Sequence, residues 1–453
     1  MQDFIVCPES KVPVVETADL VVVGGSCTGV FAAIRAARLG LKVVLIEKLN
    51  MLGGMAVSSF VNNWHSLYDT NEKKQIIGGL TAETIARLET MNGIEKVEAD
   101  MEKLRRSLYR LNPWKLAFVL DEFVKENKIR LYLHTTYVKV ISEERKISAV
   151  LINNVDGISA IKTRFLIDAT GNGVIARDLG CPSYRADYLQ PPTSCFLMQG
   201  KIKNDKYYEI LAKHSAEFGF SDDWGWSCNV PGMNNITLRA DRHVLGLLCD
   251  DAKELTEAEM EGRHIAKKFM DMLNKYTDGE ELSITAFCSN LGVRETVHFK
   301  TRYCANADDL LKGKRFEAPI MNGSYRIDIH HPDDGGITFR ELDGREIDIV
   351  GSGSKVTRSN WRERLGLTDP PATYYQLPFD VLVGEEYDNF IAVGRMVNSD
   401  IDAFGAVRVM VNLNQMGEAA GVAAYVCLNQ NRSLQDVDGK VVTETLRSGG
   451  SLL

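Results

Sequence analysis

The first fifty residues alternate between short apolar runs and a longer segment with helical spacing. Residues 20–23 are continuously apolar and β-branched, as in a buried parallel strand. Two glycines follow, and apolar residues then recur on one face of an Ala-rich segment that Gly40 ends. A second apolar run, residues 42–46, closes at Glu47. The pattern predicts a strand–helix–strand unit of about 30 residues.

The next hundred residues change from helical to strand-like patterning. Residues 72–110 are charged and helix-prone, Pro113 interrupts them, and a further helix is expected to reach about Asn127. Four strand-like segments separated by turn residues then predict a meander. They are residues 130–134, 137–142, 147–155 and 158–167, and the last runs into the motif IDATGNG.

The pattern of apolar and polar residues changes again from about Gln190 onward. A helix is predicted over residues 256–274, and the Gly-, Asp- and Ser-rich residues 333–370 are expected to be looped. An apolar strand returns after Tyr387, and a long helix rich in small residues is predicted from about 407 to 428. A chain of 453 residues exceeds the roughly 250–300 at which a single core stops growing, so we expect two domains.

Composition and charge exclude several classes of protein. Hydrophobic residues make up 45% and charged residues 25% of the chain, which excludes wholesale disorder. The net charge of −8 argues against a nucleic-acid partner. The longest uncharged run, residues 49–68, carries too many polar groups to span a bilayer, and the N-terminus lacks a signal-peptide pattern. A cytoplasmic protein without a membrane span is expected.

The nine cysteines show no spacing of the kind that holds a metal or a cluster. No two are three residues apart, whereas zinc and iron–sulfur sites normally use such pairs. We therefore predict no metal site and mostly reduced thiols. Cys27 lies at the start of a predicted helix, a position that lowers a thiol pKa, but a packing role is favoured for it.

The residues between the first strand and helix form a phosphate-binding motif. Residues 24–29, GGSCTG, match G-x-G-x-x-G except that Ser26 replaces the second glycine. The free N–H groups and the dipole of a helix N-terminus favour an anion there. Glu47 follows 23 residues after Gly24, a spacing suited to binding ribose hydroxyls. Dinucleotide binding is favoured over a turn that serves packing alone.

Six segments together resemble the FAD-dependent oxidoreductases with the glutathione-reductase-type FAD fold. They are DLVVVGGSCTGVFAAIRAARLGLKVVLIEK, LGGMA, FLIDATGNG, LGVRET, YRIDIH and AVGRMVNSDIDAFGAVRVMVNLNQMGEAAGVAA. The chain is similar to the branch of fumarate reductase flavoproteins and to the flavin subunit of heterodisulfide reductase. The resemblance implies an α/β fold: a Rossmann-type FAD-binding domain, residues 1–187 and 381–453, with an inserted α+β substrate or cap domain, residues 188–380.

The resemblance also implies which residues hold FAD. The pyrophosphate would lie at the glycine-rich turn, the ribose at Glu47, and adenine at the strand of Val138, while the later segments approach the flavin. A helix N-terminus would point at the flavin after residues 406–408. The implied residues are Gly24, Gly25, Ser26, Gly29, Glu47, Lys48, Gly53, Gly54, Met55, Val138, Ala169, Thr170, Gly171, Gly394, Arg395, Ala406 and Val407.

Three features depart from the family pattern. Ser26 replaces a glycine, Val297-His298 stands where Arg-Arg is common, and Thr301 stands where a glycine is usual. No histidine is placed for covalent flavin attachment, so noncovalent FAD is expected. The departures lie mainly on the substrate side.

Candidate catalytic residues cluster in two segments, LGVRET-VH and YRIDIHH. On a strand, Asp328 and His330 share one face and His331 lies on the other. The resemblance favours His330 as catalytic, with His298 and Arg294 as further candidates. Each histidine also has a purely structural interpretation. Arg294 has three: it clamps a substrate carboxylate, pairs with Glu295, or approaches the flavin.

These features predict an FAD-dependent oxidoreductase that transfers a hydride between a small polar organic substrate and the flavin N5. Its electron donor or acceptor is left open, and no second nicotinamide-binding fingerprint is evident. Two alternatives are kept. One is a flavin electron-transfer subunit of a heterodisulfide-reductase-like complex. The other is a flavin-binding protein with structural FAD and no redox turnover.

Overall fold

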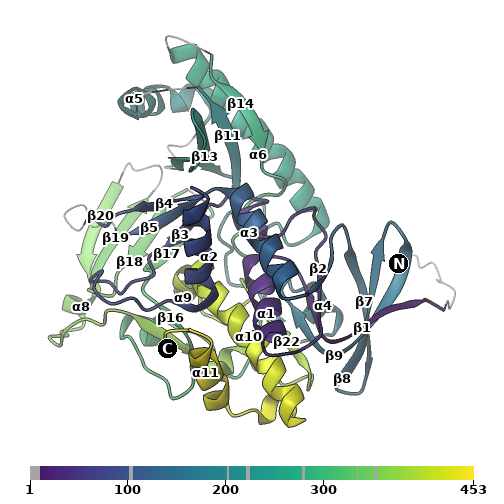
Figure 1. Cartoon of the computed structure of the whole chain (residues 1–453). Helices are drawn as coiled ribbons and strands as arrows, with labels where there is room; N and C mark the ends of the chain where they lie inside the picture. Colours follow the sequence, from purple (N-terminus) through teal and green to yellow (C-terminus); the bar gives the residue numbers. More distant parts are fainter. Residues whose placement is uncertain are drawn as a thin grey trace, which may run out of the picture.

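A seven-stranded mixed sheet forms the centre of the fold. The computed structural model describes residues 11–100, 106–200, 202, 204–220, 225–277, 281–333, 335–350 and 355–453. Within them the sheet has the strand order β6-β2-β1-β9-β8-β7, and β22 also pairs with β9 (Figure 1). The strands are β1 (Val14–Val23), β2 (Val43–Ile46), β6 (Arg130–Tyr132), β7 (Thr136–Glu143), β8 (Lys146–Asn154), β9 (Gly157–Asp168) and β22 (Phe390–Ala392).

The parallel strands of this sheet end at one common edge. Val23 of β1 pairs with Ile46 of β2 and with Asp168 of β9, and Ala392 of β22 also pairs with Asp168. Strand β9 is long enough to pair with β8 in its first half and with β22 in its second. The loops that follow β1, β2, β9 and β22 therefore meet, as in nucleotide-binding α/β sheets.

Two parallel helices pack tightly beside the sheet. They are α1 (Cys27–Arg38) and α10 (Met410–Gln430). A Cβ on Gly417 would lie 2.2 Å from the carbonyl oxygen of Thr28, and one on Gly421 would lie 2.2 Å from that of Ala32. Residue numbers rise together along both helices at these contacts, so the helices are parallel. Since α1 follows the end of β1 directly, both N-termini face the carboxyl edge of the sheet. From the 1.5 Å rise per residue, α10 begins about 9 Å beyond the start of α1.

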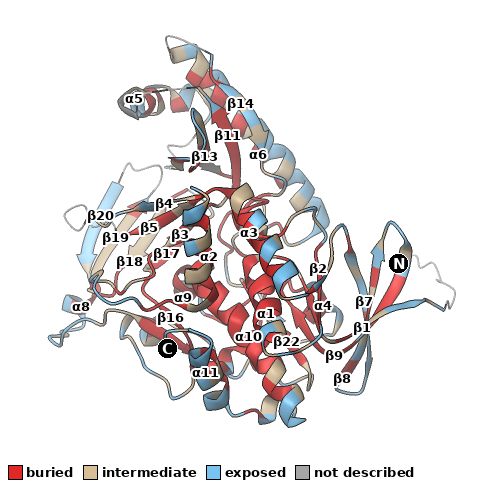
Figure 2. Ribbon diagram, viewed as in Figure 1, coloured by how far each residue is buried: buried red, intermediate tan, exposed pale blue. Residues whose placement is uncertain are grey.

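Two antiparallel sheets lie outside this centre. One consists of β12 (Trp226–Asn229), β13 (Ile236–His243), β11 (Thr193–Gln199) and β14 (Ser283–Phe287), and it packs with α5 (Asn204–His214) and α6 (Ala252–Tyr276) at the top of Figure 1. The other consists of β17 (Ile327–His330), β18 (Ile337–Arg340), β19 (Arg345–Val350) and β20 (Lys355–Asn360). Strand β20 is largely exposed, whereas β17 is largely buried (Figure 2).

Smaller elements complete the described structure. The helices are α2 (Gly79–Thr90), α3 (Pro113–Glu126), α4 (Val174–Asp178), α7 (Ala307–Leu311), α8 (Trp361–Arg364), α9 (Ile401–Val407) and α11 (Gly439–Ser448). The strands are β3 (Asn63–His65), β4 (Ile94–Val97), β5 (Leu108–Leu111), β10 (Ser183–Tyr184), β15 (His298–Phe299), β16 (Pro319–Gly323) and β21 (Tyr375–Pro378). None of the helices in the described ranges is long and apolar enough to cross a membrane.

The α/β architecture with a parallel core agrees with the sequence expectation, and two local predictions are wrong. Residues 333–370 are not a loop, because they contain β18, β19, β20 and α8. Residues 94–97 and 108–111, within the helix-prone region, are strands β4 and β5, which pair with each other. Pairing with distant strands outweighs local helix propensity there. Residues 101–105 of that region lie outside the described part.

The largest hydrophobic cluster crosses the predicted domain boundary. It includes Val30 of α1 and Val422 of α10 together with Ile320 and Leu377, which fall within residues 188–380. The sheet of β12, β13, β11 and β14 packs in two smaller clusters, one with Phe196 and Phe269 and the other with Leu238 and with Phe60 of the N-terminal region. The division at residues 188 and 380 stays a prediction.

Candidate functional site

The glycine-rich turn joins β1 to α1 with almost no free space around its backbone. Ser26 is the N-cap of α1, and its Oγ accepts a hydrogen bond from the Gly29 N–H at 3.4 Å. Gly24 has φ +109°, and a Cβ there would lie 2.4 Å from the Ala169 carbonyl oxygen. A Cβ on Gly29 would lie 1.9 Å from the Gly24 carbonyl oxygen. The turn thus requires glycine at both positions.

Glu47 is buried at the end of β2 and is held by backbone donors. Its Oε2 accepts from the Gly25 N–H at 2.6 Å and its Oε1 from the Leu49 N–H at 2.8 Å. Lys48 is the next residue along the same loop. Each carboxylate oxygen keeps a further lone pair, so Glu47 braces the turn and can still accept a ligand hydroxyl.

The start of β7 also reaches this edge. The Thr135 N–H donates to the Glu47 carbonyl oxygen at 3.1 Å. Three residues on, the pairing of β7 with β8 is irregular between Tyr137 and Lys139, so Val138 has no Cα partner in that ladder. Such a β-bulge presents backbone groups outside the sheet.

The loop after β9 is shaped by Asp168. This fully buried carboxylate accepts from the backbone N–H and Oγ1 of Thr170 and from the N–H groups of Ile175 and Ala176. Burial raises its pKa despite these hydrogen bonds. Asp168 therefore fixes the course of Ala169, Thr170 and Gly171 without being free for catalysis.

The loop after β2 closes over the glycine-rich turn. The Gly53 N–H donates to the Gly25 carbonyl oxygen at 2.8 Å, and Ser26 forms a parallel bridge with Gly53. Gly53 and Gly54 have φ of +111° and +50°. Met55 follows, and its Sδ lies 3.9 Å from Nη1 of Arg395.

Arg395 follows Gly394 in the loop after β22. Its guanidinium donates to Asn172 and lies 3.2 Å from the position of a Cβ on Gly171, while its Nε is buried without a hydrogen-bond partner among the described residues. Burial lowers the pKa of Arg395 to about 10. A cation placed this way favours a negatively charged ligand.

Ala406 and Val407 lie apart from these loops, at the buried end of α9. The Ala406 carbonyl oxygen accepts from the Tyr375 hydroxyl at 3.2 Å and from Asn412 Nδ2 at 3.0 Å. Both residues precede the first turn of α10, which lies beyond the glycine-rich turn.

Most of the residues expected to bind FAD therefore lie at one sheet edge. The glycine cradle, the helix N-terminus and the unpartnered Arg395 Nε fit a dinucleotide with a negatively charged diphosphate.

Asp328 and His330 form the centre of a second polar cluster, on β17. His330 Nε2 lies 3.3 Å from Asp328 Oδ1, and the Tyr325 hydroxyl donates to Asp328 Oδ2 at 2.5 Å. Arg408, just after α9, donates to the Asp328 carbonyl oxygen at 3.1 Å. The His243 ring of β13 lies 4.7 Å from that of His330. Nδ1 of His330 is buried and has no hydrogen-bond partner within the described residues.

Arg294 lies near this cluster, and Gly292 of the same segment approaches the loop of Met55. Its Nη1 donates to the Pro191 carbonyl oxygen and to Thr193 Oγ1, each at 2.6 Å. A Cβ on Gly292 would lie 3.7 Å from Met55 Cε. Glu295 accepts a hydrogen bond from Gln190 and contacts His298, and Arg294 contributes positive charge at His330.

His298 is buried and both of its ring nitrogens are engaged. Nδ1 lies 2.7 Å from the Val397 carbonyl oxygen and Nε2 lies 2.9 Å from Glu295 Oε1. The other oxygen of Glu295 accepts from the Gln190 N–H, and Gln190 Oε1 accepts from the His330 N–H. His298 thus supports the segment around His330, and no nitrogen of its ring is left for a substrate.

Cys27 has the packing role that the sequence favoured. Burial raises the pKa of its thiol to about 12, which outweighs its place at a helix start, and the thiol packs beside Gly53. His65 and His243 escaped the sequence analysis because neither belongs to a motif. Among the described residues, the acidic group Asp250, Asp251 and Glu254 could hold a metal ion, but Asp250 already pairs with Arg177 and Arg185.

The sheet edge, turn and helix define a Rossmann-type dinucleotide-binding protein. The chain belongs to the FAD dependent oxidoreductase family, whose model matches residues 19–446. The protein is therefore an FAD-dependent oxidoreductase, and FAD is its cofactor.

Comparison with known proteins adds distant structural likenesses. No curated protein matches the chain by sequence. The fold is similar to p-nitrophenol 4-monooxygenase from Pseudomonas putida, with 9% identity, a TM-score of 0.47 and coverage of 95% of this chain and 84% of that one. It is also similar to a geranylgeranyl bacteriochlorophyll reductase-like protein from Thermoplasma acidophilum, with 12% identity, a TM-score of 0.45 and coverage of 96% and 82%.

Proposed function

We propose that the protein transfers a hydride between a small polar organic substrate and noncovalently held FAD, with His330 as its acid–base residue. The observation that carries this proposal is the buried, unpartnered Nδ1 of His330 beside the Asp328 carboxylate. General acid–base catalysis needs such a nitrogen within reach of the proton that moves.

The protonation states of the pair suit a base. Burial, together with the charge of Arg294, holds the pKa of His330 well below its usual range, so the imidazole is neutral at pH 7. Burial would raise the pKa of Asp328, but Arg408, Arg326 and the Tyr325 hydroxyl outweigh it and hold that pKa low. The ionised carboxylate favours the proton of His330 on Nε2 and leaves the lone pair on Nδ1.

FAD and the residues around His330 have separate roles in this reaction. FAD, when bound, supplies the acceptor or donor of the hydride. When the C–H bond of the substrate is oxidised, His330 Nδ1 takes the proton of the substrate hydroxyl or amine group. In the reverse direction His330 returns that proton to the substrate. Arg294 and Arg408 place positive charge around His330 and orient a polar substrate.

The residues proposed to hold FAD are those gathered at the sheet edge. Gly24, Gly25, Ser26 and Gly29 face the pyrophosphate, Glu47 and Lys48 the ribose, and the Val138 backbone the adenine. Gly53, Gly54, Met55, Ala169, Thr170, Gly171, Gly394 and Arg395 line the remainder, and Ala406 and Val407 lead to the helix N-terminus at the flavin.

Anaerobic bleaching of the flavin by a panel of hydroxy and amino metabolites tests the proposal. The purified holoprotein should lose its flavin absorbance with at least one compound, and His330→Ala should slow that loss about a hundredfold or more. His331→Ala is the matched control, because His331 Nε2 instead contacts Thr338 Oγ1 at 2.8 Å. Equal rates in His330→Ala and the parent would remove His330 from the mechanism.

Bleaching only through a partner protein would favour the electron-transfer alternative. A flavin that no metabolite and no partner reduces would favour a structural cofactor. Either result would overturn the proposed direct hydride transfer.

A further inference from the structure

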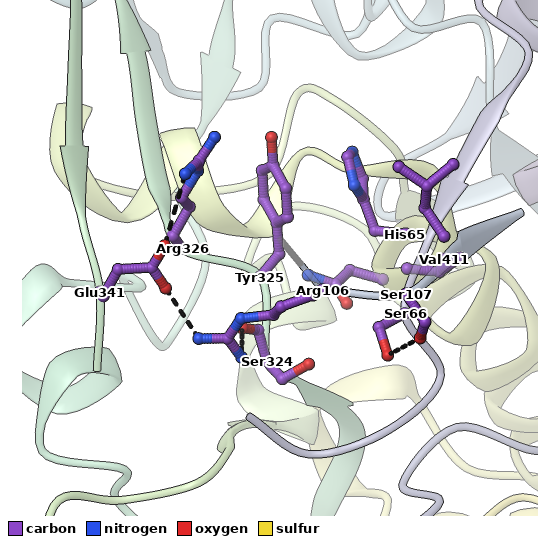
Figure 3. A pocket seen from close by; sticks show the side chains of 11 residues that line it. His65, Ser66, Arg106, Ser107, Ser324, Tyr325, Arg326, Glu341 and Val411 are labelled. Atoms are coloured by element: carbon purple, nitrogen blue, oxygen red, sulfur yellow. Dashed lines mark hydrogen bonds and ion pairs between the residues drawn. The ribbon is translucent and has the colours of Figure 1, made fainter. Parts of the chain in front are cut away.

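A separate cavity of about 150 Å³ is lined by Tyr325 but not by Asp328. Figure 3 shows the Tyr325 ring between Arg326 and His65, with Arg106 and Ser324 below it. The rings of Tyr325 and His65 lie 3.9 Å apart. The residues expected to bind FAD are absent from the lining, so this cavity is a different space from the sheet-edge site.

The first turn of α10 contributes Val411 and Asn412 to the wall. The N-cap residue, Val409, offers no side-chain cap to the free N–H groups of this 21-residue helix. These N–H groups point at the flavin in the proposed function, so a ligand of this cavity needs other donors. The cavity therefore lies beside the helix start proposed for the flavin.

Asn412 supplies the sign of a ligand in this cavity. Its Nδ2 donates to the Tyr375 hydroxyl and to the Ala406 carbonyl oxygen, which orients the amide. Its Oδ1 is buried and has no hydrogen-bond partner among the described residues, and only 1% of the residue is exposed. A buried acceptor of this kind lacks a donor, such as a hydroxyl group.

The charged groups on the wall are two guanidinium groups and one carboxylate. Arg106 Nη2 lies 2.7 Å from Glu341 Oε2, and Arg326 Nη1 lies 3.4 Å from Glu341 Oε1. Glu341 thus stands between both cations, as Figure 3 shows, and leaves them donors to spare. Burial lowers the pKa of His65 to about 4, so that ring is neutral.

A further carboxylate, Glu72, lies behind the serines of the wall. It accepts hydrogen bonds from the hydroxyls of Ser66 and Ser107, and the Ser107 N–H also donates to it. The two serine oxygens also lie 2.9 Å apart, and Ser66 Oγ accepts from the Tyr68 N–H, so Ser107 Oγ is the oxygen that keeps a lone pair for a ligand donor. This side of the cavity favours a hydroxyl, while the arginine side favours an anion.

The volume limits the ligand to a few heavy atoms. A cavity of about 150 Å³ accommodates a benzene-sized molecule, and an isoalloxazine ring system is much larger. We propose that this cavity binds a small monocarboxylate that carries a hydroxyl group. The carboxylate would meet Arg106 and Arg326, and the hydroxyl would donate to Asn412 Oδ1.

Binding is measured on the holoprotein by titration calorimetry with lactate as the probe. Lactamide has the same shape without the charge, and propionate has the charge without the hydroxyl. Lactate should bind, while lactamide and propionate should each bind about tenfold or more weakly. The assay involves no turnover, so its result is separate from that of the flavin-bleaching test.

Three variants localise the site. Arg106→Gln and Arg326→Gln should each weaken lactate binding about tenfold. Arg110→Gln is the matched control, because Arg110 on the same segment pairs with Glu95 away from the cavity wall. Leu108→Phe keeps all charges and fills the cavity, and it should abolish binding while the flavin spectrum is unchanged.

The opposite results are equally specific. No binding of lactate, or lactamide binding as tightly as lactate, would overturn the proposal. So would undiminished lactate binding in Leu108→Phe, since the ligand would then lie elsewhere. Circular dichroism of each variant distinguishes loss of the site from loss of the fold.

Discussion

Arg35 of α1 and Glu418 of α10 form a buried ion pair across the close contact between these two helices. Arg35 Nε donates to Glu418 Oε2 at 2.7 Å, and side-chain exposures are 7% and 1%. The other oxygen of Glu418 accepts from the Leu80 N–H at 3.0 Å. Burial raises the pKa of Glu418 although Arg35 opposes that shift. The pair thus links both glycine-lined helices to the start of α2.

Removing one partner of this ion pair should lower the stability of the protein. Arg35→Met leaves a buried carboxylate without its cation and should lower the free energy of unfolding by about 3–5 kcal/mol. The double variant Arg35→Met/Glu418→Met should lose clearly less than the sum of the single changes. Urea unfolding measures all three. Arg38→Met is the control, since its partly exposed pair with Glu83 contributes at most about 1 kcal/mol. Additive losses in the double variant would contradict coupling between Arg35 and Glu418.

A methyl group on Gly29 should disturb FAD binding. The Cβ of Gly29→Ala would lie 1.9 Å from the Gly24 carbonyl oxygen, so the turn must open although alanine favours the helix. The FAD content of the purified protein should fall at least about tenfold. Gly384→Ala is the control, because its Cβ meets only the flexible end of Glu386, at 3.3 Å. Full FAD content in Gly29→Ala would show that the turn does not contact the cofactor.

His65 should make stability depend on pH. Its pKa is about 4 in the folded protein and near 6.5 when exposed, so the unfolded state binds the additional proton. Stability is then fully present above about pH 6.5 and is lost as the pH falls toward 4, by about 3 kcal/mol at most. His65→Phe keeps a ring beside Tyr325 and should flatten this acid limb in unfolding free energies measured between pH 7 and 4. If the pH dependence of the unfolding free energy were the same in His65→Phe and the parent, the pKa of His65 would not be lowered by folding.

His298 should matter for stability rather than for catalysis. A proton is needed between His298 Nε2 and Glu295 Oε1, and His298→Gln disrupts that contact in the core. We expect a loss of about 1–3 kcal/mol in unfolding free energy, while the bleaching rate per bound flavin changes less than about threefold. A large fall in that rate at unchanged stability would instead make His298 catalytic.

Local sequence was sufficient where a motif needs only near neighbours. The strand, glycine turn and helix of residues 20–38 follow from hydrophobic spacing, and the close approach at Gly29 explains the glycine there. The period of two along a strand predicted that His330 and His331 lie on opposite faces, and the family resemblance favoured His330; the two side chains do have different partners, Asp328 and Thr338.

Contacts between distant segments could not be obtained in this way. In the residues of β18 and β19, apolar and polar side chains alternate too weakly to predict strands. They form strands because each pairs with its neighbours in a four-stranded sheet. His243 and His65 carry no motif, yet β13 and β3 bring them to His330 and Tyr325.

The sequence alone thus determined the dinucleotide-binding turn, because the turn depends on backbone freedom and spacing within about 30 residues. The choice of FAD came from the family resemblance of segments spread over residues 18–424. Only the tertiary structure decided which ionisable groups are free. His298 is satisfied by Glu295 and Val397, whereas Nδ1 of His330 is left open. Burial and hydrogen-bond partners arise from packing between segments far apart in the chain, and they set both the charge and the availability of a side chain.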